Sequence, residues 1–148
     1  MGTTFVGMLF GGGRLALAHV GDSRAYLFRQ GRLRGLTEDH SIVGELLRRH
    51  EISEQDAAQH PHRHVLTRAL GVRATTEPDL AEMTPQEGDV FVLCSDGLTG
   101  LVEDDEIAAR IAGEDDLEAA AEGLVDAANG AGGDDNVTVL LVRCEKED

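Results

Sequence analysis

The sequence is poor in residues that build special scaffolds: it has no tryptophan, one tyrosine, three prolines and two cysteines. Cys94 and Cys144 each lie in or at the end of an apolar run, which favours reduced thiols that pack in the core. The longest apolar runs, residues 90–94 and 137–142, are far shorter than the roughly 20 residues of a membrane span. Residues 1–5 lack the basic residues that open a secretory signal. We therefore expect a cytoplasmic protein with no membrane partner.

Length and composition are those of one globular domain. The chain has 148 residues, of which 41% are hydrophobic and 28% are charged, and this length is sufficient to bury a core. No internal repeat, low-complexity tract or linker divides the sequence. We expect residues 1–148 to form a single domain that ends in a charged tail at residues 145–148.

Acidic charge dominates the second half of the chain. The formal net charge is −15; residues 1–74 hold ten arginines against seven acidic residues, whereas residues 75–148 hold three basic residues against 21 acidic ones. Such a surface repels phosphates, which argues against a nucleic-acid partner. Acidic clusters also attract cations, although most of these carboxylates are expected to lie on a solvated surface.

Hydrophobic periodicity predicts an α+β fold, with mostly antiparallel sheet and helices packed on it. Helical spacing predicts a helix after His40, a second helix start at Ser53, and helices over residues 103–112 and 115–129. The first four strands are expected to pair as an antiparallel meander, and the last two to be buried. The expected strands span residues 3–10, 14–20, 23–29, 32–36, 77–83, 90–94 and 136–143.

Three aspartates stand beside glycines at the mouths of expected strands: Asp22, Asp96 and Asp135. A carboxylate in such a place is held by a rigid sheet and still reaches solvent. Mg²⁺ and Mn²⁺ prefer oxygen ligands and keep several waters, so three convergent aspartates would supply most of a site. Each aspartate alone is also a common turn residue, because its side chain bonds its own backbone.

Other polar residues have two interpretations each. Three histidines within residues 60–64 form either a metal-binding tract or a solvated stretch, and the solvated stretch is favoured because imidazole suits transition metals. His19 on an alternating strand is interpreted as a core or cleft histidine with its hydrogen bonds made. Arg24 and Arg68 are candidates for a bidentate grip on phosphate or for structural ion pairs with acidic residues.

Five local motifs, in their order along the chain, resemble those of the PP2C (PPM) family. They lie at residues 18–26 (AHVGDSRAY), 37–41 (TEDHS), 66–71 (LTRALG), 88–98 (GDVFVLCSDGL) and 135–138 (DNVT). The members are metal-dependent protein serine/threonine phosphatases, here of the bacterial type. The motifs have family-like spacing and cover nearly the whole chain.

The resemblance implies a β-sandwich of two antiparallel sheets flanked by helices, with two Mn²⁺ or Mg²⁺ ions at one end. By this likeness Asp96 and Asp135 match ligands of the paired metals, and Asp22 with Asp96 matches a third, weaker site. The family uses water or hydroxide between the metals to attack the phosphorus of phosphoserine or phosphothreonine. Residues 41–65 match the family's variable flap, which is expected to contact substrate.

The chain departs from the family pattern at its beginning. Family members carry, before the Gly-Thr-Thr strand, an arginine that grips phosphate, a Glu-Asp pair and a bridging Asp-Gly, and none of these is present. The sequence is therefore interpreted as an N-terminally truncated domain, with apolar surface and sheet edges left uncovered. No catalytic residue beyond the metal ligands is expected.

The expected function is protein serine/threonine phosphatase activity. The family resemblance implies that the substrates are proteins phosphorylated by a Ser/Thr kinase. Two alternatives follow from the missing segment. The chain is either a catalytically inactive binding or regulatory module, or one partner of a complementation in which a separate polypeptide adds strands to the open edges.

Overall fold

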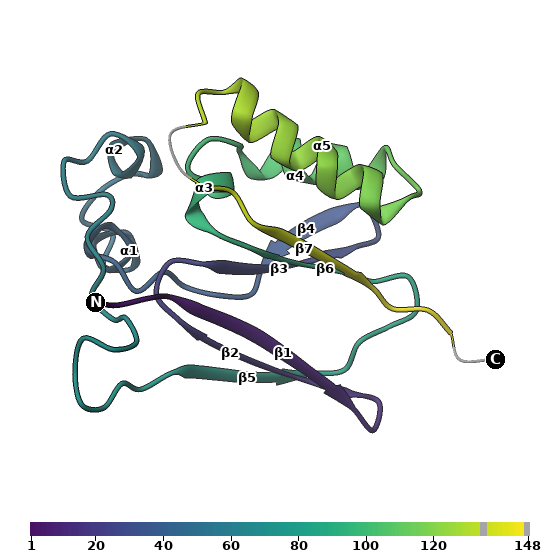
Figure 1. The fold of residues 1–148 in the computed structure, drawn as a ribbon, viewed down its shortest axis with the longest axis horizontal. Coiled ribbons are helices and arrows are strands. Elements are labelled where there is room, and N and C mark those ends of the chain that lie inside the picture. The colour runs from purple at the N-terminus through teal and green to yellow at the C-terminus, as the bar shows by residue number, and fades with distance from the viewer. Residues whose placement is uncertain (134–135, 147–148) are drawn as a thin grey trace.

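The computed structural model describes residues 1–133 and 136–146. Within them the strands form two antiparallel sheets that face each other, with strand orders β1-β2-β5 and β4-β3-β6-β7 (Figure 1). This agrees with the α+β class that the hydrophobic periodicity predicts and with the sandwich that the family resemblance implies. The strands are β1 (Phe5–Gly11), β2 (Arg14–Val20), β3 (Arg24–Arg29), β4 (Arg32–Gly35), β5 (Asp79–Met83), β6 (Val90–Cys94) and β7 (Val139–Arg143).

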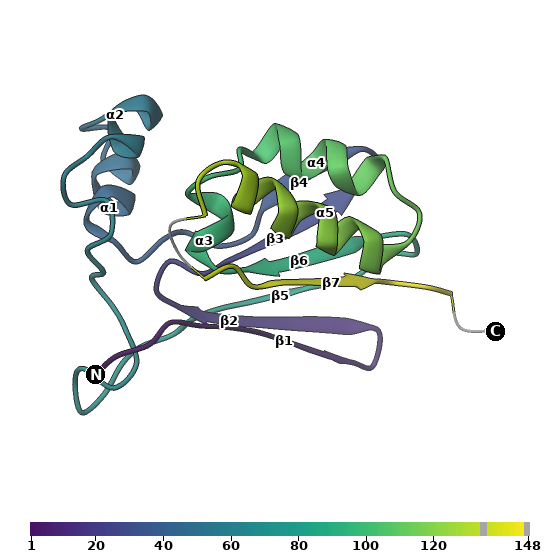
Figure 2. The same cartoon turned by 45° about the horizontal axis from the view of Figure 1, so that its top comes forward.

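The helices gather in two places around the sheets. Helices α4 and α5 lie along the outer face of the second sheet, and α1 and α2 stand together at one end of the sandwich (Figures 1 and 2). In the part of the chain described, no helix has both the length and the apolarity needed to cross a membrane. The helices are α1 (Ile42–Arg48), α2 (Glu54–Ala58), α3 (Asp96–Thr99), α4 (Asp104–Ala112) and α5 (Leu117–Gly130).

Strand β6 lies at the centre of the core and is buried on both faces. Its residues Val92 and Cys94 pack with Leu124 of α5 and other residues under the helices. Phe91 and Leu93, which point the opposite way, pack against Leu15, Leu17 and their neighbours between the two sheets. The double burial explains why the run over residues 90–94 is apolar at every position.

Strand pairing differs from the predicted meander. Strand β2 pairs with β1 and β5, whereas β3 pairs with β4 and β6, so the chain changes sheets between Val20 and Arg24. Strand β3 is buried on both sides, with Leu27 between the sheets and Tyr26 under the helices, which requires a place in the middle layer. The prediction that β2 and β3 are neighbours in one sheet is therefore wrong.

The last strand also differs from its prediction. Strand β7 begins at Val139 rather than at residue 136, and it is the edge strand of the second sheet. Leu140 is 53% exposed, so this strand is only partly buried. Helix α3 was not predicted, because four residues are too few to show a helical period.

The outer face of the first sheet carries exposed apolar side chains. Leu9 lies opposite Ala16, on the face turned away from Leu15. Leu9 and Leu80 are 74% and 75% exposed. Uncovered apolar surface of this kind is what the sequence predicts, and a contiguous patch of it is typical of interaction surfaces.

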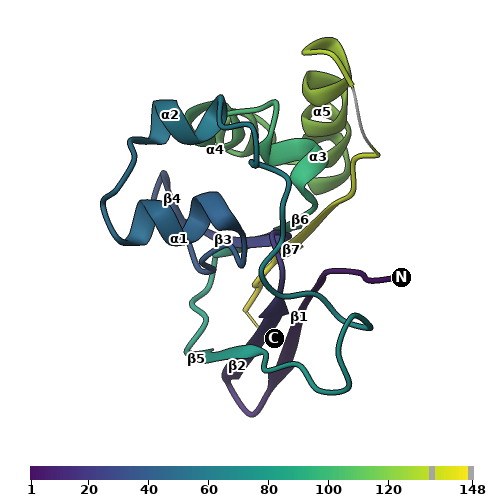
Figure 3. The ribbon, with the colours of Figure 1, turned by 90° about the vertical axis from the view of Figure 1, so that its left-hand side faces the viewer.

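Helices α1 and α2 belong to a segment whose two ends meet. Ser41 caps α1 by accepting a hydrogen bond from the Gly44 N–H (3.0 Å), and Ser53 forms a capping box at the start of α2, as predicted. An isolated bridge joins Ser41 to Leu66 and closes the base of the segment. In the end-on view the two helices stand away from the first sheet (Figure 3).

We expect Leu124→Ala to lower the free energy of unfolding by about 3 kcal/mol, because the Leu124 side chain is fully buried and its loss leaves a cavity. Urea unfolding followed by circular dichroism measures this change. The control is Leu80→Ala, the same substitution at a 75% exposed position, for which a change within about 0.5 kcal/mol is expected. Equal effects of the two substitutions would contradict the assignment of the core.

Candidate metal centre

The strand register brings Asp22 and Asp96 to the same edge of the second sheet. Arg24 at the start of β3 lies opposite Cys94 at the end of β6, and Cys94 lies opposite Val139 at the start of β7. Asp22 shortly precedes β3, and Asp96 shortly follows β6. Both aspartates therefore stand where a rigid sheet ends, as their sequence positions predict.

Asp135, the third predicted ligand, lies outside the described residues. The segment that follows it is held against the start of α3. The Ser95 N–H donates to the Thr138 carbonyl oxygen (3.1 Å), and the Thr138 N–H donates to Ser95 Oγ (3.0 Å). A Cβ added to Gly97 would overlap the carbonyl oxygen of Asn136, so only glycine permits this close approach.

A tight turn carries Asp22 from one sheet to the other. Gly21 has a φ of +105°, a region that favours glycine, and a Cβ there would lie 2.6 Å from Thr4 Cγ2. On the other side of Asp22, Ser23 Oγ lies 2.7 Å from Thr4 Oγ1 in a hydrogen bond. The glycine thus allows the turn to lie directly on Thr4.

The environment of Asp22 disfavours its negative charge. Burial, together with repulsion by the carboxylates of Asp96 and Asp39, raises the pKa of Asp22 to about 6. Arg24 and a backbone hydrogen bond offset this only in part. A bound cation would remove the repulsion, so this pair of carboxylates fits a hard divalent ion.

Neither predicted phosphate-gripping arginine is free. Arg24 donates through Nε and Nη2 to both carboxylate oxygens of Asp39 (2.9 and 2.8 Å) and through Nη1 to the Tyr26 hydroxyl (3.0 Å). Arg68 donates to Asp79 Oδ1 (2.9 Å). Of the two interpretations left open by the sequence, the structure shows structural ion pairs for both residues.

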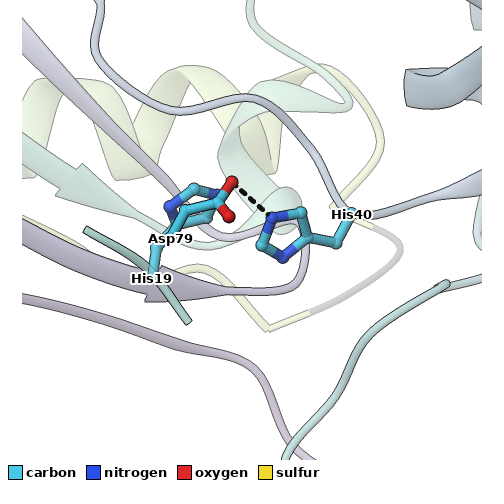
Figure 4. A group of neighbouring side chains, drawn as sticks. All are labelled: His19, His40 and Asp79. Atoms are coloured by element: carbon cyan, nitrogen blue, oxygen red, sulfur yellow. Dashed lines mark hydrogen bonds and ion pairs between the residues drawn. The ribbon is translucent and has the colours of Figure 1, made fainter. Parts of the chain in front are cut away.

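A cluster of two buried histidines, His19 and His40, and the half-exposed Asp79 lies beside the turn at Gly21 (Figure 4). Each residue offers one possible ligand atom, and these atoms lie within 4.8 Å of one another. His19 is 3% exposed and its Nε2 lies 3.0 Å from the Glu38 carbonyl oxygen, which confirms the prediction of a satisfied core histidine.

The sequence interpretation missed His40 and Asp79 as residues of interest. His40 lies in the motif at residues 37–41, but from sequence it marks only the residue after which a helix is predicted. Asp79 begins β5 and lies opposite His19 in the register of the first sheet. A prediction of the β2–β5 pairing would have found the cluster, but alternation alone does not show which strands are neighbours.

The histidines at residues 60–64 do not form a comparable cluster. The ring centroids of His60 and His62 are 5.8 Å apart, and His60 Nδ1 accepts the His62 N–H (3.0 Å). His62 and His64 are exposed. This arrangement agrees with the solvated stretch that the sequence favours.

Comparison with known proteins identifies the family. Residues 1–137 match the family described as Protein phosphatase 2C, and the chain belongs to this family. It is 46% identical over 142 residues to a serine/threonine phosphatase, stp, of Listeria welshimeri, a match that covers 96% of the chain and 56% of that protein. The chain thus spans little more than half the length of this curated relative.

Solved structures of similar proteins have the same fold. The serine/threonine phosphatase PstP/Ppp of Mycobacterium tuberculosis superposes with a TM-score of 0.93 at 39% identity, over 99% of this chain and 61% of that one. The catalytic domain of a protein phosphatase PstP in complex with two manganese ions has a TM-score of 0.90 at 36% identity, over 99% of this chain and 60% of that one. The predicted PP2C-type sandwich is confirmed.

We expect Asp22→Asn to stabilise the metal-free chain at pH 7. A pKa raised to about 6 means that stability decreases as pH rises from about 4 to about 6, because the folded chain holds this proton more tightly than the unfolded chain. This rise in the pKa of Asp22 corresponds to a loss of at most about 3 kcal/mol in the free energy of unfolding. Solvent screening of the partly exposed carboxylate reduces the loss to about 1–2 kcal/mol.

Thermal unfolding in the presence of a chelator measures this effect. At pH 7 the Asp22→Asn variant should unfold at a higher temperature than the wild type, and the difference should shrink at pH 4. The exposed Asp126 of α5 supplies the control, because Asp126→Asn removes a charge without relieving this repulsion. A variant at Asp22 that is less stable than the wild type at pH 7 would contradict the electrostatic assignment.

Proposed function

We propose that the chain takes part in a protein serine/threonine phosphatase that hydrolyses phosphoserine and phosphothreonine with the aid of Mn²⁺ or Mg²⁺. The observation that carries the proposal is the pair of mutually repelling carboxylates, Asp22 and Asp96, at one sheet edge of a PP2C-family fold. The chain covers 56% of its Listeria relative, so activity of the whole protein is part of the proposal.

The donor set supports a hard divalent cation. Asp22 and Asp96 offer carboxylate oxygens, which Mg²⁺ and Mn²⁺ prefer over nitrogen or sulfur. We propose Asp96 and Asp135 as ligands of two paired ions, and Asp22 with Asp96 as ligands of a third, weaker one. The related PstP domain in complex with two manganese ions supports a centre of two such ions.

The chemistry follows from the ions and from the rigidity of the edge. Bound divalent ions lower the pKa of water and neutralise the charge that develops on phosphoryl oxygens. The role of the chain is to hold its carboxylates in place: Asp96 is fixed by the start of α3 and Asp22 by the turn at Gly21. No side chain of the chain needs to form a covalent bond with phosphate.

The proposal extends to the substrates and the location of the protein. We propose phosphorylated proteins, modified by a Ser/Thr kinase, as substrates, in a signalling role and without nucleic-acid or membrane partners. Residues 41–65 stand beside the edge that carries Asp22 and are proposed to contact substrate. A cytoplasmic location is supported by Cys94 and Cys144, which are both free.

We expect Asp96→Asn to weaken Mn²⁺ binding more than Asp22→Asn does, because Asp96 is assigned to both the paired and the third site. A loss of at least tenfold is expected for Asp96→Asn, since a carboxylate bound directly to the ion is removed. Isothermal titration of the purified chain with Mn²⁺ measures the affinities, and Asp126→Asn is the matched control. Equal affinities of the two site variants would overturn the assignment.

We expect Mn²⁺-dependent hydrolysis of p-nitrophenyl phosphate by the purified chain, lost in Asp96→Asn and retained in Asp126→Asn. This experiment also tests the alternative of a catalytically inactive binding or regulatory module. If Mn²⁺ binds and no hydrolysis exceeds that of Asp96→Asn, the chain alone is inactive and the alternative is favoured. If neither binding nor hydrolysis is found, the metal centre itself is refuted.

A further inference from the structure

His40 joins the base of the segment at residues 41–65 to the turn that carries Asp22. Its side chain is 2% exposed. The His40 N–H donates to the Gly21 carbonyl oxygen (3.0 Å), and the His40 carbonyl oxygen accepts from the Thr67 N–H (2.9 Å). The main chain of His40 is therefore bonded both to the turn and to Thr67, where the chain returns after the segment at residues 41–65.

The ring of His40 makes a second bond to the same glycine. The Gly21 N–H donates to His40 Nδ1 (3.0 Å), and His40 Nε2 lies 2.8 Å from Asp79 Oδ2. A backbone N–H can only donate, so Nδ1 must carry a lone pair and Nε2 must carry the proton that it donates to Asp79. Both polar groups of the Gly21 backbone are thus held by His40.

The surroundings fix this ring on its other sides. The His19 ring stacks on it, with centroids 4.5 Å apart and planes 17° apart. Arg68 donates to the second oxygen of Asp79 (2.9 Å). Both ring nitrogens of His40 are used in hydrogen bonds. His40 therefore has no nitrogen left to bind a metal in the cluster of His19, His40 and Asp79. The arrangement is that of a support for the turn.

We propose that His40 is a positioning residue for Asp22, and that its bond to the Gly21 N–H sets the affinity of Asp22 for a divalent cation. The metal part of this inference rests on the proposed function. Glycine at positive φ has much backbone freedom, and the carboxylate of Asp22 is repelled by its neighbours. An external hydrogen bond is therefore needed to keep the turn in one conformation.

Two substitutions of the same ring separate this role from a general contribution to stability. In His40→Asn, the amide oxygen lies near the place of Nδ1 and still accepts the Gly21 N–H. In His40→Gln, the longer amide reaches toward Asp79 and leaves the Gly21 N–H without its acceptor. Both variants lose the stacked ring, so both should unfold at lower temperature than the wild type.

The two variants should differ in metal binding and in hydrogen exchange at Gly21. We expect His40→Gln to weaken Mn²⁺ binding about tenfold, the low end of the effect of losing a partner outside the ligand shell, and His40→Asn to stay within about threefold of the wild type. Isothermal titration measures the affinities. Exchange of the Gly21 amide, followed by NMR, should be faster in His40→Gln and nearly unchanged in His40→Asn.

A third variant tests the same support without altering the buried ring. Asp79 is half-exposed on an edge strand, so Asp79→Ala should fold. Without Asp79 as acceptor, the proton of the His40 ring is no longer fixed on Nε2, and Nδ1 is no longer kept free to accept the Gly21 N–H. We therefore expect weaker Mn²⁺ binding and faster exchange of the Gly21 amide. The control on the same strand is Glu82→Ala, which removes a carboxylate that is paired with Arg14 and should change neither readout.

The outcomes distinguish failure of this inference from failure of the proposed function. Equal Mn²⁺ affinity of His40→Gln and the wild type, or equal losses in the Gln and Asn variants, would overturn the positioning role. If the wild-type chain binds no Mn²⁺, the proposed function fails and the link to metal affinity fails with it. Hydrogen exchange of the Gly21 amide then remains as the test of whether His40 fixes the conformation of the turn. An unchanged exchange rate in His40→Gln would refute that role.

Discussion

Burial of strand β6 on both faces determines how the two sheets and the helices are arranged. Val92 under the helices and Phe91 between the sheets are both fully inaccessible to solvent. A strand in this position must be paired on both sides to satisfy its backbone, and β3 and β7 are its partners. That pairing fixes the register that brings the start of β3 and the start of β7 to the end of β6. The geometry of the candidate metal centre is thus decided by apolar packing several residues away from it.

The same register gathers negative charge where the sheet ends. Asp22 and Asp96 repel each other, and burial adds to the cost of charging Asp22. In the absence of a cation this arrangement opposes folding, so stability and metal binding make opposite demands on one side chain. The core under α4 and α5 supplies the stability that such a site requires. Carboxylates exposed on the helices, such as Asp126, carry no comparable cost because water solvates them.

The sequence predicts those features that depend on residues close together in the chain, namely single strands and the places where they end. Alternation identifies β2, the apolar run identifies β6, and the glycines beside Asp22 and Asp96 mark where the chain leaves the sheet, by a turn at Asp22 and by helix α3 at Asp96. It does not predict that β2 and β3 separate into different sheets, because alternation tells which face of a strand is buried and not which strand lies beside it. For the same reason the contact between His40 and Asp79, which are 39 positions apart, was not predicted. The role of Asp135 stays a prediction from sequence.

The polar residues next to the Gly21 turn, the buried His40 and the half-exposed Asp79, determine the conformation of the turn as well as its place. In the described part of the chain every buried side-chain nitrogen or oxygen has a hydrogen-bond partner. A fully satisfied network of this kind adds little net stability compared with apolar packing, but it permits only one arrangement of its members. Around Gly21 that arrangement includes the two hydrogen bonds between Gly21 and His40 and the ion pair of Arg68 with Asp79. Apolar contacts could bury the turn equally well, but they would leave the orientation of the carboxylate next to it undetermined. The polar network is therefore best understood as the element that turns a flexible glycine into a fixed point from which Asp22 extends.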